Sequence, residues 1–148
     1  MKSNRSIIAI CAVALIVLVS ACTPKPSDSP ERSVELYLSA LVEKDGASLA
    51  GLSCASWEPN ALMELDSFQA VEVYLSDLSC ESSGSENQFK VVKCEGFLVA
   101  TYNGENQNID LSARDYLVQE SSNGYLVCGY KWNVGYFLKK ISMQSDFA

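Results

Sequence analysis

The 148-residue chain contains no histidine. This absence excludes Ser-His-Asp and Cys-His catalysis, and it argues against a zinc site, because imidazole is a usual zinc ligand. The cysteines form no Cys-x-x-Cys pair, so a metal knuckle or a redox-active dithiol has no support either. Any chemistry would have to rest on carboxylates, tyrosines or lysines. The sequence predicts no catalytic set, no metal ligands and no cofactor-binding residues.

Long hydrophobic runs are also missing. The longest apolar run, Ile7 to Val19, has thirteen residues, which is short of the roughly 20 that a membrane-spanning helix needs. It follows a start that carries Lys2 and Arg5 and no acidic residue, and small residues come directly after it. This arrangement is typical of a secretory signal peptide, which we predict over residues 1–21.

The four residues Val19-Ser20-Ala21-Cys22 close this segment. They resemble the lipobox of bacterial lipoproteins, which consists of an aliphatic residue, two small residues and a cysteine. The resemblance implies that Cys22 receives a diacylglyceryl group on its sulfur, with fatty acids such as palmitate, and becomes the new N-terminus after cleavage. The alternatives are an ordinary signal peptide in which Cys22 is incidental, and a retained membrane anchor.

Residues 22–29 have the composition of a flexible tether, since Pro24 and Pro26 favour extended backbone and the neighbouring residues are too polar to pack. One acyl chain binds a bilayer only marginally, at about 0.8 kcal/mol for each buried CH₂, so stable attachment needs two or more chains. We therefore expect an extracytoplasmic domain that the lipid on Cys22 anchors to the cell membrane, or to the outer membrane in a source with two membranes.

Positive charge is scarce. When Lys2 and Arg5 leave with the signal peptide, nine of the eleven basic residues remain against eighteen acidic ones, and the net charge is near −9. Nucleic acids and anionic lipid headgroups would repel such a domain, so we expect no nucleic-acid partner. The remaining 127 of the 148 residues suffice for one domain with a core, which we place at residues 30–148.

Helical patterns come first in this domain. An amphipathic helix is predicted over residues 30–44, started by Asp28 or Ser29 as the cap. A second short helix is predicted over residues 45–53, and a third short one around Trp57 to Leu65, interrupted by Pro59. The apolar stripe of the first helix consists of Val34, Tyr37, Leu38, Leu41 and Val42.

Strand patterns follow after Ser67. The expected strands span residues 69–78, 89–102, 109–119 and 125–132, the second with a bulge at Gly96. The turns between them are expected at residues 82–87, at Asn103-Gly104 and at residues 122–124. Residues 134–143 would either extend the last strand or form a short basic amphipathic segment.

Four cysteines remain once Cys11 leaves and Cys22 is lipidated. An even number in an exported domain predicts two disulfides, with free buried thiols as the alternative. The candidates are Cys54, Cys80, Cys94 and Cys128.

The expected register bears on how these cysteines pair. The expected register places Cys94 and Cys128 both opposite Tyr116, about 10 Å apart, which is too far for a disulfide. This register favours Cys80–Cys94 with Cys54–Cys128. A bulge near Gly96 would instead allow Cys54–Cys80 with Cys94–Cys128.

Helices followed by a strand meander define an α+β domain. The stretch "SPERSVELYLSALVEKDGASLAGL" resembles the opening helices of nuclear-transport-factor-2-like (NTF2-like) domains, and the strands after it resemble the second half of small bacterial lipoproteins with that fold. The resemblance covers about residues 30–130. It implies N-terminal helices packed on a curved, antiparallel, four-stranded meander that forms a cone.

The resemblance also frames the functional alternatives. NTF2-like cones enclose a pocket, and some members are enzymes that use an Asp base with a Tyr donor. Core-facing tyrosines more often serve packing, and no catalytic motif of the family matches here. The conceivable pocket residues are Tyr37, Tyr74, Tyr102, Tyr116, Asp66 and Asp115.

We therefore expect a lipid-anchored, non-catalytic module of the cell envelope that binds a small molecule or another envelope protein. The alternative is a small isomerase-like or dehydratase-like pocket enzyme that acts on a small organic substrate, and a third possibility is a purely structural role. Weaker candidates are Trp57 and Trp132 as a binding surface, Glu43/Asp45 and Glu64/Asp66 as calcium ligands, and Lys139-Lys140 at lipid headgroups.

Overall fold

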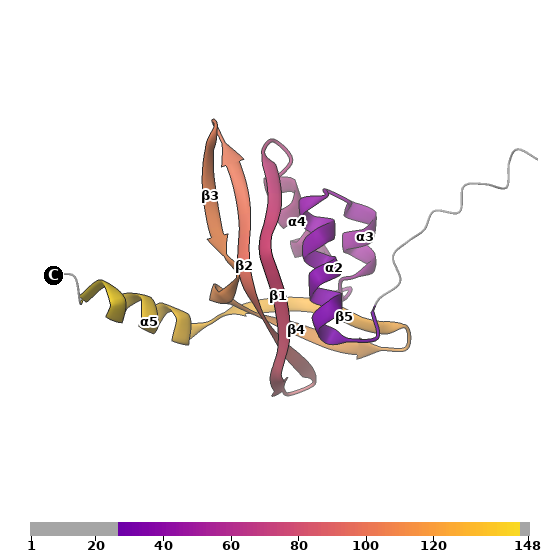
Figure 1. Ribbon diagram of the computed structural model, residues 1–148. Coiled ribbons are helices and arrows are strands. Elements are labelled where there is room, and N and C mark those ends of the chain that lie inside the picture. Colours follow the sequence, from indigo (N-terminus) through magenta and orange to yellow (C-terminus); the bar gives the residue numbers. More distant parts are fainter. Residues whose placement is uncertain (1–26, 146–148) are drawn as a thin grey trace, which may run out of the picture.

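The computed structural model describes residues 27–145, in which helices precede an antiparallel sheet (Figure 1). The helices that come first are α2 (Pro30–Val42), α3 (Gly46–Gly51) and α4 (Glu58–Ser67). The strands are β1 (Glu72–Glu86), β2 (Phe89–Tyr102), β3 (Glu105–Asp110), β4 (Arg114–Ser121) and β5 (Gly124–Trp132). A 3₁₀ turn, η1 (Leu111–Ala113), separates β3 from β4, and helix α5 (Val134–Ser145) follows β5.

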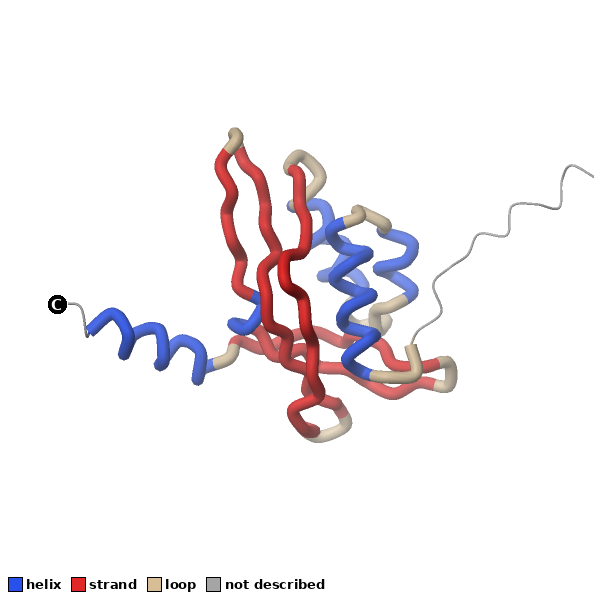
Figure 2. The backbone as a smooth tube through the Cα atoms, in the orientation of Figure 1, coloured by secondary structure: helices blue, strands red, loops and turns tan. Residues whose placement is uncertain are grey.

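The sheet is built around β2. One edge of β2 pairs with β1, and the other edge pairs with β3 along its C-terminal half and with β4 along its N-terminal half. Strand β5 pairs with β4, and all of these pairings are antiparallel. The sheet curves beside the helices, as Figure 2 shows. The α+β class, with helices followed by a curved antiparallel sheet, is therefore confirmed.

The predicted strand at residues 109–119 is divided in two. The Asp110 side chain accepts a hydrogen bond from the backbone N–H of Ser112 (3.0 Å), and this cap starts η1. Because η1 interrupts the pairing, the described sheet has five strands and not the expected four. Asp110 and Ser112 compete locally with the strand hydrogen bonds, which explains the break.

The first two turns differ in how well they were predicted. Strand β1 continues through the expected turn at residues 82–87, and Glu86 pairs directly with Phe89. The Asn103-Gly104 turn is present as predicted, with positive φ at both residues (52° and 82°), as a type I′ turn requires.

An irregularity does lie at Gly96, but the extra residues belong to β1. Asp77 and Leu78 lie between the paired residues Ser76 and Ser79 and face Gly96. Gly96 has φ +100°, and a Cβ on it would lie 2.5 Å from the Ser76 carbonyl oxygen. Only glycine fits this close approach of two strands.

The expected register between β4 and β5 was wrong. The turn is centred on Ser122–Asn123, and a bulge leaves Cys128 between the pairs Leu117–Gly129 and Val118–Val127. Tyr116 therefore faces Val92 and Tyr130, and faces neither Cys94 nor Cys128.

The cysteines nevertheless form the favoured pairs. Cys54 pairs with Cys128, with a Cα–Cα distance of 4.9 Å, and Cys80 pairs with Cys94 at 4.1 Å. The second pair joins residues that face each other directly across β1 and β2. Cys54 lies between α3 and α4, so the first pair joins the helical layer to β5.

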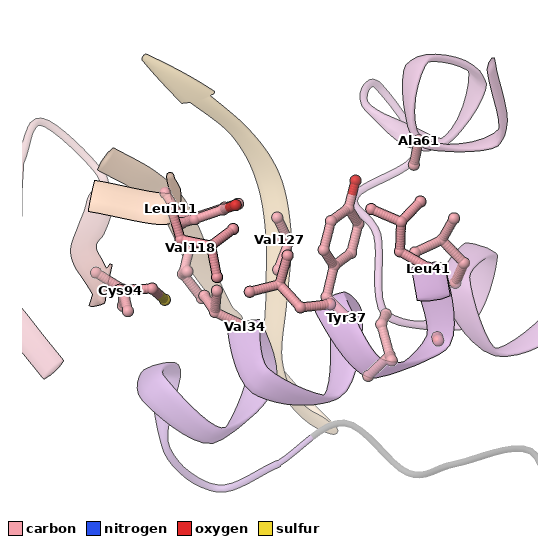
Figure 3. Packing of buried hydrophobic residues seen from close by; sticks show 14 of the residues in the cluster. Val34, Tyr37, Leu41, Ala61, Cys94, Leu111, Val118 and Val127 are labelled. Atoms are coloured by element: carbon pink, nitrogen blue, oxygen red, sulfur yellow. The ribbon is translucent and has the colours of Figure 1, made fainter. Parts of the chain in front are cut away.

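Helix α2 forms the centre of the core. The Ser29 hydroxyl accepts a hydrogen bond from the backbone N–H of Arg32 (3.2 Å) and caps the helix, which ends two residues earlier than predicted. Val34 and Tyr37 belong to the same buried cluster as Val118 and Val127 of the sheet, and the hydroxyl end of Tyr37 points towards α4 (Figure 3). Burial of such apolar side chains is the main contribution to the stability of a domain.

The other helices confirm or correct smaller predictions. Asp45 caps α3 as expected, and Leu49 and Leu52 are buried. Pro59 lies in the first turn of α4 and does not interrupt it, because the first turn needs no N–H from that position. Residues 134–143 form a helix, so extension of the last strand was wrong. In Figure 1, α5 projects away from the rest of the domain.

The N-terminal end of the described chain is attached to β5. The Tyr125 N–H donates a hydrogen bond to the Ser27 carbonyl (3.0 Å). The predicted signal peptide, Cys22 and most of the tether lie outside the described residues. Within residues 27–145, the helices are all too short or too polar to cross a bilayer.

Candidate functional site

A surface pocket of about 340 Å³ lies between α4 and β5. Its α4 residues follow one another at spacings of three, one and three, so they share one face of the helix. The residues that line it are Trp57, Asn60, Met63, Glu64, Ser67 and Tyr130.

An ion pair forms one wall of this pocket. Glu64 accepts a hydrogen bond from Arg114 at 2.7 Å, and the two side chains are only 15% and 13% exposed. Burial opposes the charge on Arg114, but the charge and hydrogen bond of Glu64 outweigh that effect, so the Arg114 pKa lies above its ordinary value. A mostly buried pair of this kind is costly to break, because the remaining partner is left uncompensated.

Aromatic rings continue from the pocket towards α5. The Tyr130 ring meets the rings of Trp57 and Trp132 edge to face, with centroids 5.5 and 5.9 Å apart. The Trp132 ring meets Phe137 of α5 in the same way at 6.0 Å. We call these four residues, Trp57, Tyr130, Trp132 and Phe137, the aromatic strip. The Arg114 guanidinium lies 4.3 Å from the Tyr130 ring centroid, within the range of a cation–π contact.

Gly129 allows Trp57 to reach the sheet. A Cβ on Gly129 would lie 3.3 Å from the Trp57 ring, and the residue has φ +137°, which side chains rarely tolerate. The position of the strip on β5 therefore depends on this glycine as well as on the aromatic residues.

Two buried tyrosines lie beneath the pocket. Tyr37 accepts a hydrogen bond from the Trp57 indole N–H (3.1 Å), whereas the Tyr116 hydroxyl has no partner among the described residues. Burial is the main cause that raises the pKa of both tyrosines well above the ordinary value, and the Glu64 charge adds to it. For Tyr116 the nearby Arg114 charge acts in the opposite direction.

The candidate pocket residues from the sequence are only partly brought together. Tyr37 and Tyr116 lie near each other, but Tyr74 and Tyr102 are 47% and 58% exposed on the β1–β3 part of the sheet. Asp66 is exposed on α4.

Asp115 is buried on β4, but it alternates with Tyr116 and so belongs to the opposite face of the sheet. The carboxylate whose charge acts on both tyrosines is that of Glu64, which is held by Arg114. The arrangement does not reproduce the predicted Tyr/Asp pair.

Two of the four calcium candidates, Asp45 and Glu64, serve other roles. Asp45 accepts hydrogen bonds from Ser48, which lower its pKa, and Glu64 pairs with Arg114. In the part of the chain that the structure describes, no three Cys, Asp or Glu side chains are grouped to hold a metal ion.

The sequence interpretation missed Arg114 and Tyr130. A signal was present, since Arg114 and Tyr116 share one face of β4 by alternation and an arginine at such a position needs a buried partner. Its partner, Glu64, is 50 residues away along the chain, so only the fold reveals the pair.

Comparison with known proteins adds little. No protein-family model matches the chain, and no curated protein matches it. One solved structure that resembles it is the 1.8 Angstrom structure of Aln2 from a Streptomyces species, at 8% sequence identity and a TM-score of 0.48. The match covers 74% of this chain and 90% of Aln2. A likeness at this level supports no statement on function.

Proposed function

We propose that this chain is a lipid-anchored, extracytoplasmic, non-catalytic module that binds a partner through the aromatic strip. The observation that carries this proposal is the combination of exposed aromatic and methionine side chains with a carboxylate that is already held in an ion pair. Aromatic residues, methionine and arginine are enriched in the centres of protein interfaces. Trp132 is 56% exposed and Met63 is 66% exposed, so both are accessible to a partner.

The compartment follows from the cysteines. Two disulfides are typical of an oxidising, extracytoplasmic environment. The lipid anchor is a finer proposal, which the lipobox-like sequence before Ser27 supports. Ser27 lies five positions after Cys22, a distance of at most about 18 Å for extended chain, so the domain would stay close to the bilayer.

The cone-like NTF2-like fold is likewise part of the proposal. It is supported by the order of the elements, with α2 to α4 before a curved sheet that packs against α2.

An enzymatic role is less well supported. General acid–base catalysis needs a carboxylate that can reach the proton it takes. Asp66 and Asp115 do not accompany the buried tyrosines, and the oxygen of Glu64 is engaged by Arg114. Recognition therefore fits this arrangement better than proton transfer.

The anchor is tested by lipid labelling. Full-length chain should incorporate radiolabelled palmitate and fractionate with membranes, whereas Cys22→Ala should incorporate none. Cys11→Ala is the matched control, because it removes a cysteine within the predicted signal peptide. Equal labelling of wild type and Cys22→Ala would overturn the lipid anchor.

Binding through the strip is tested in living cells with a photo-crosslinking amino acid. Placed at Trp132, it should give a discrete crosslinked product, whereas the same group at Tyr102 should not. Tyr102 is the control because it is similarly exposed (58%) but lies on the β2–β3 hairpin. Products at Tyr102 alone would assign binding to another surface and contradict the proposal.

A further inference from the structure

Five of the eight large apolar side chains that are exposed among the described residues follow one path from the pocket to α5, and the other three lie on β1 and β2. Met63 borders the pocket, Trp132 continues the strip, and α5 adds three more. Each is between 42% and 68% exposed, and the rings of Trp132 and Phe137 contact each other. Contiguous apolar surface of this kind marks an interaction site. The residues are Met63, Trp132, Val134, Phe137 and Leu138.

Helix α5 is the part of the path that the rest of the domain covers least. Val134, Phe137 and Leu138 stand at spacings of three and four, so they form one stripe of the helix, and the described chain leaves all three exposed. Such i, i+3 and i+4 anchors are how an amphipathic helix binds in a groove. The pocket of α4 cannot receive this helix from its own chain, because α5 leads away from the domain after Trp132 (Figure 1).

Charge distinguishes the two ends of the path. Helix α4 carries three carboxylates and no basic residue, and although Glu64 already pairs with Arg114, Glu58 and Asp66 remain. Helix α5 carries Lys139 and Lys140 and no acidic residue. The basic helix is therefore complementary to the acidic helix, although the chain as a whole is acidic. An anionic membrane is a poorer partner, because the net charge near −9 that remains without the predicted signal peptide would oppose its approach.

We infer that the partner at the aromatic strip is a second copy of this chain, and that α5 of each copy lies on the α4 pocket of the other. Because one chain carries both α5 and the pocket that would receive it, two copies related by a two-fold axis can satisfy each other. The assembly is then a closed dimer. Helix α5 has 12 residues and α4 has 10, which correspond to about 18 and 15 Å, so the helices match in length. This inference depends on the strip being the binding surface, as proposed above.

The test uses two differently tagged full-length chains that are expressed together. The quantity measured is how much of one tag is recovered with the other from a detergent extract. Wild-type copies should co-purify, and Leu138→Asp in both copies, or Met63→Asp in both, should reduce recovery at least tenfold. Tyr102→Asp is the control and should leave recovery unchanged.

Co-expression of the two different variants distinguishes reciprocal docking of α5 on the α4 pocket from a general loss of exposed apolar surface. A Leu138→Asp copy has an intact pocket, and a Met63→Asp copy has an intact α5. Together they rebuild one wild-type contact, so the mixed pair should be recovered several-fold better than either variant with itself. Recovery no better than that of the single variants would overturn the inference. Both positions are more than 60% exposed, and non-reducing gels would verify that the disulfides still form.

A photo-crosslinking group at Leu138 separates the possible occupants. A product of twice the chain mass supports the inference, provided that it contains Met63 in the crosslinked peptide. A product with another protein, or with lipid, overturns the inference, and another protein would leave the proposed interaction role standing. No product at either Leu138 or Trp132 would contradict both.

Discussion

Two helices of this molecule have the same kind of sequence and opposite surroundings. In α2 the apolar stripe is buried, with Val34 and Leu41 fully covered by the sheet and by α3. In α5 the corresponding stripe is exposed, with Val134 at 68% and Leu138 at 63%. Spacing alone therefore specifies a helix and its apolar face, but it does not specify what covers that face.

The part of the domain that covers α2 also contains both disulfides. The Cys54–Cys128 link joins the helical layer to β5 and closes a sequence separation of 74 residues, whereas Cys80–Cys94 closes 14 within the β1–β2 hairpin. Helices α2 and α5 both lie outside these loops in the sequence, but α2 packs on β1, β5 and α3, whereas the apolar stripe of α5 is exposed. Substitutions in the stripe of α2 should therefore unfold the domain, and substitutions in the stripe of α5 should not.

The largest expected effect comes from the longer disulfide loop. Replacing Cys54 and Cys128 by serine should lower the free energy of unfolding by about 4 kcal/mol, and replacing Cys80 and Cys94 by about 3 kcal/mol, because the longer loop restricts the unfolded chain more. Urea unfolding of the purified, oxidised chain measures both. Equal losses, or the reverse order, would contradict the loop-entropy account.

A matched pair of leucines tests the comparison of helices directly. Leu41→Ala should lower the free energy of unfolding by about 3 kcal/mol, since it leaves a cavity in the core. Leu138→Ala should change it by less than about 0.5 kcal/mol when copies are too dilute to associate. A loss at Leu138 as large as that at Leu41 would mean that α5 is covered within one chain.

Ionisation of buried tyrosines at high pH should lower the stability of the fold, whereas ionisation of exposed tyrosines should not. Burial raises the pKa of Tyr37 and Tyr116 in the folded state above the unfolded value of about 10. Their neutral forms therefore stabilise the fold below pH 10, and each should cost about 1.4 kcal/mol per pH unit above it, because the unfolded state then loses its protons first.

The measurement is the urea midpoint between pH 8 and pH 11. Tyr116→Phe should leave stability at pH 8 nearly unchanged, because its hydroxyl has no partner among the described residues, and should make the decline above pH 10 less steep. Tyr102→Phe is the exposed control and should not alter the decline. An identical slope for Tyr116→Phe and wild type would mean that Tyr116 ionises freely in the fold.

Local patterns predicted most of the fold. The helix at Pro30, the Asn103-Gly104 turn and the α+β class all follow from capping, turn and spacing rules that act over a few residues. The sequence interpretation failed where a side chain altered the backbone, as Asp110 does at η1, or where Cys128 entered a bulge. The cysteine pairing was right although the register behind it was wrong, because Cys80 and Cys94 face each other independently of β5.

The site could be predicted less well, for a physical reason. Glu64 and Arg114 are 50 residues apart, and the strip joins residues of three elements, so no local pattern brings them together. Trp57 and Trp132 were weaker candidates for a binding surface, with burial of at least one in the core as the alternative, and the link between them through Tyr130 was not foreseen. The lipid on Cys22 lies outside the described residues and remains a prediction.

The smallest expected effect concerns how each helix begins. Ser29 caps α2 through a hydrogen bond to the Arg32 N–H, and Asn133 caps α5 through the Tyr136 N–H (3.3 Å). Ser29→Ala should lower the free energy of unfolding by about 1 kcal/mol, while Ser29→Asn, which can still cap, should restore it. Asn133→Ala should instead leave the global unfolding midpoint nearly unchanged and reduce only the helical circular dichroism signal. If both alanine variants shifted the midpoint equally, α5 would be coupled to the core as tightly as α2, and the difference between a covered and an uncovered helix would disappear.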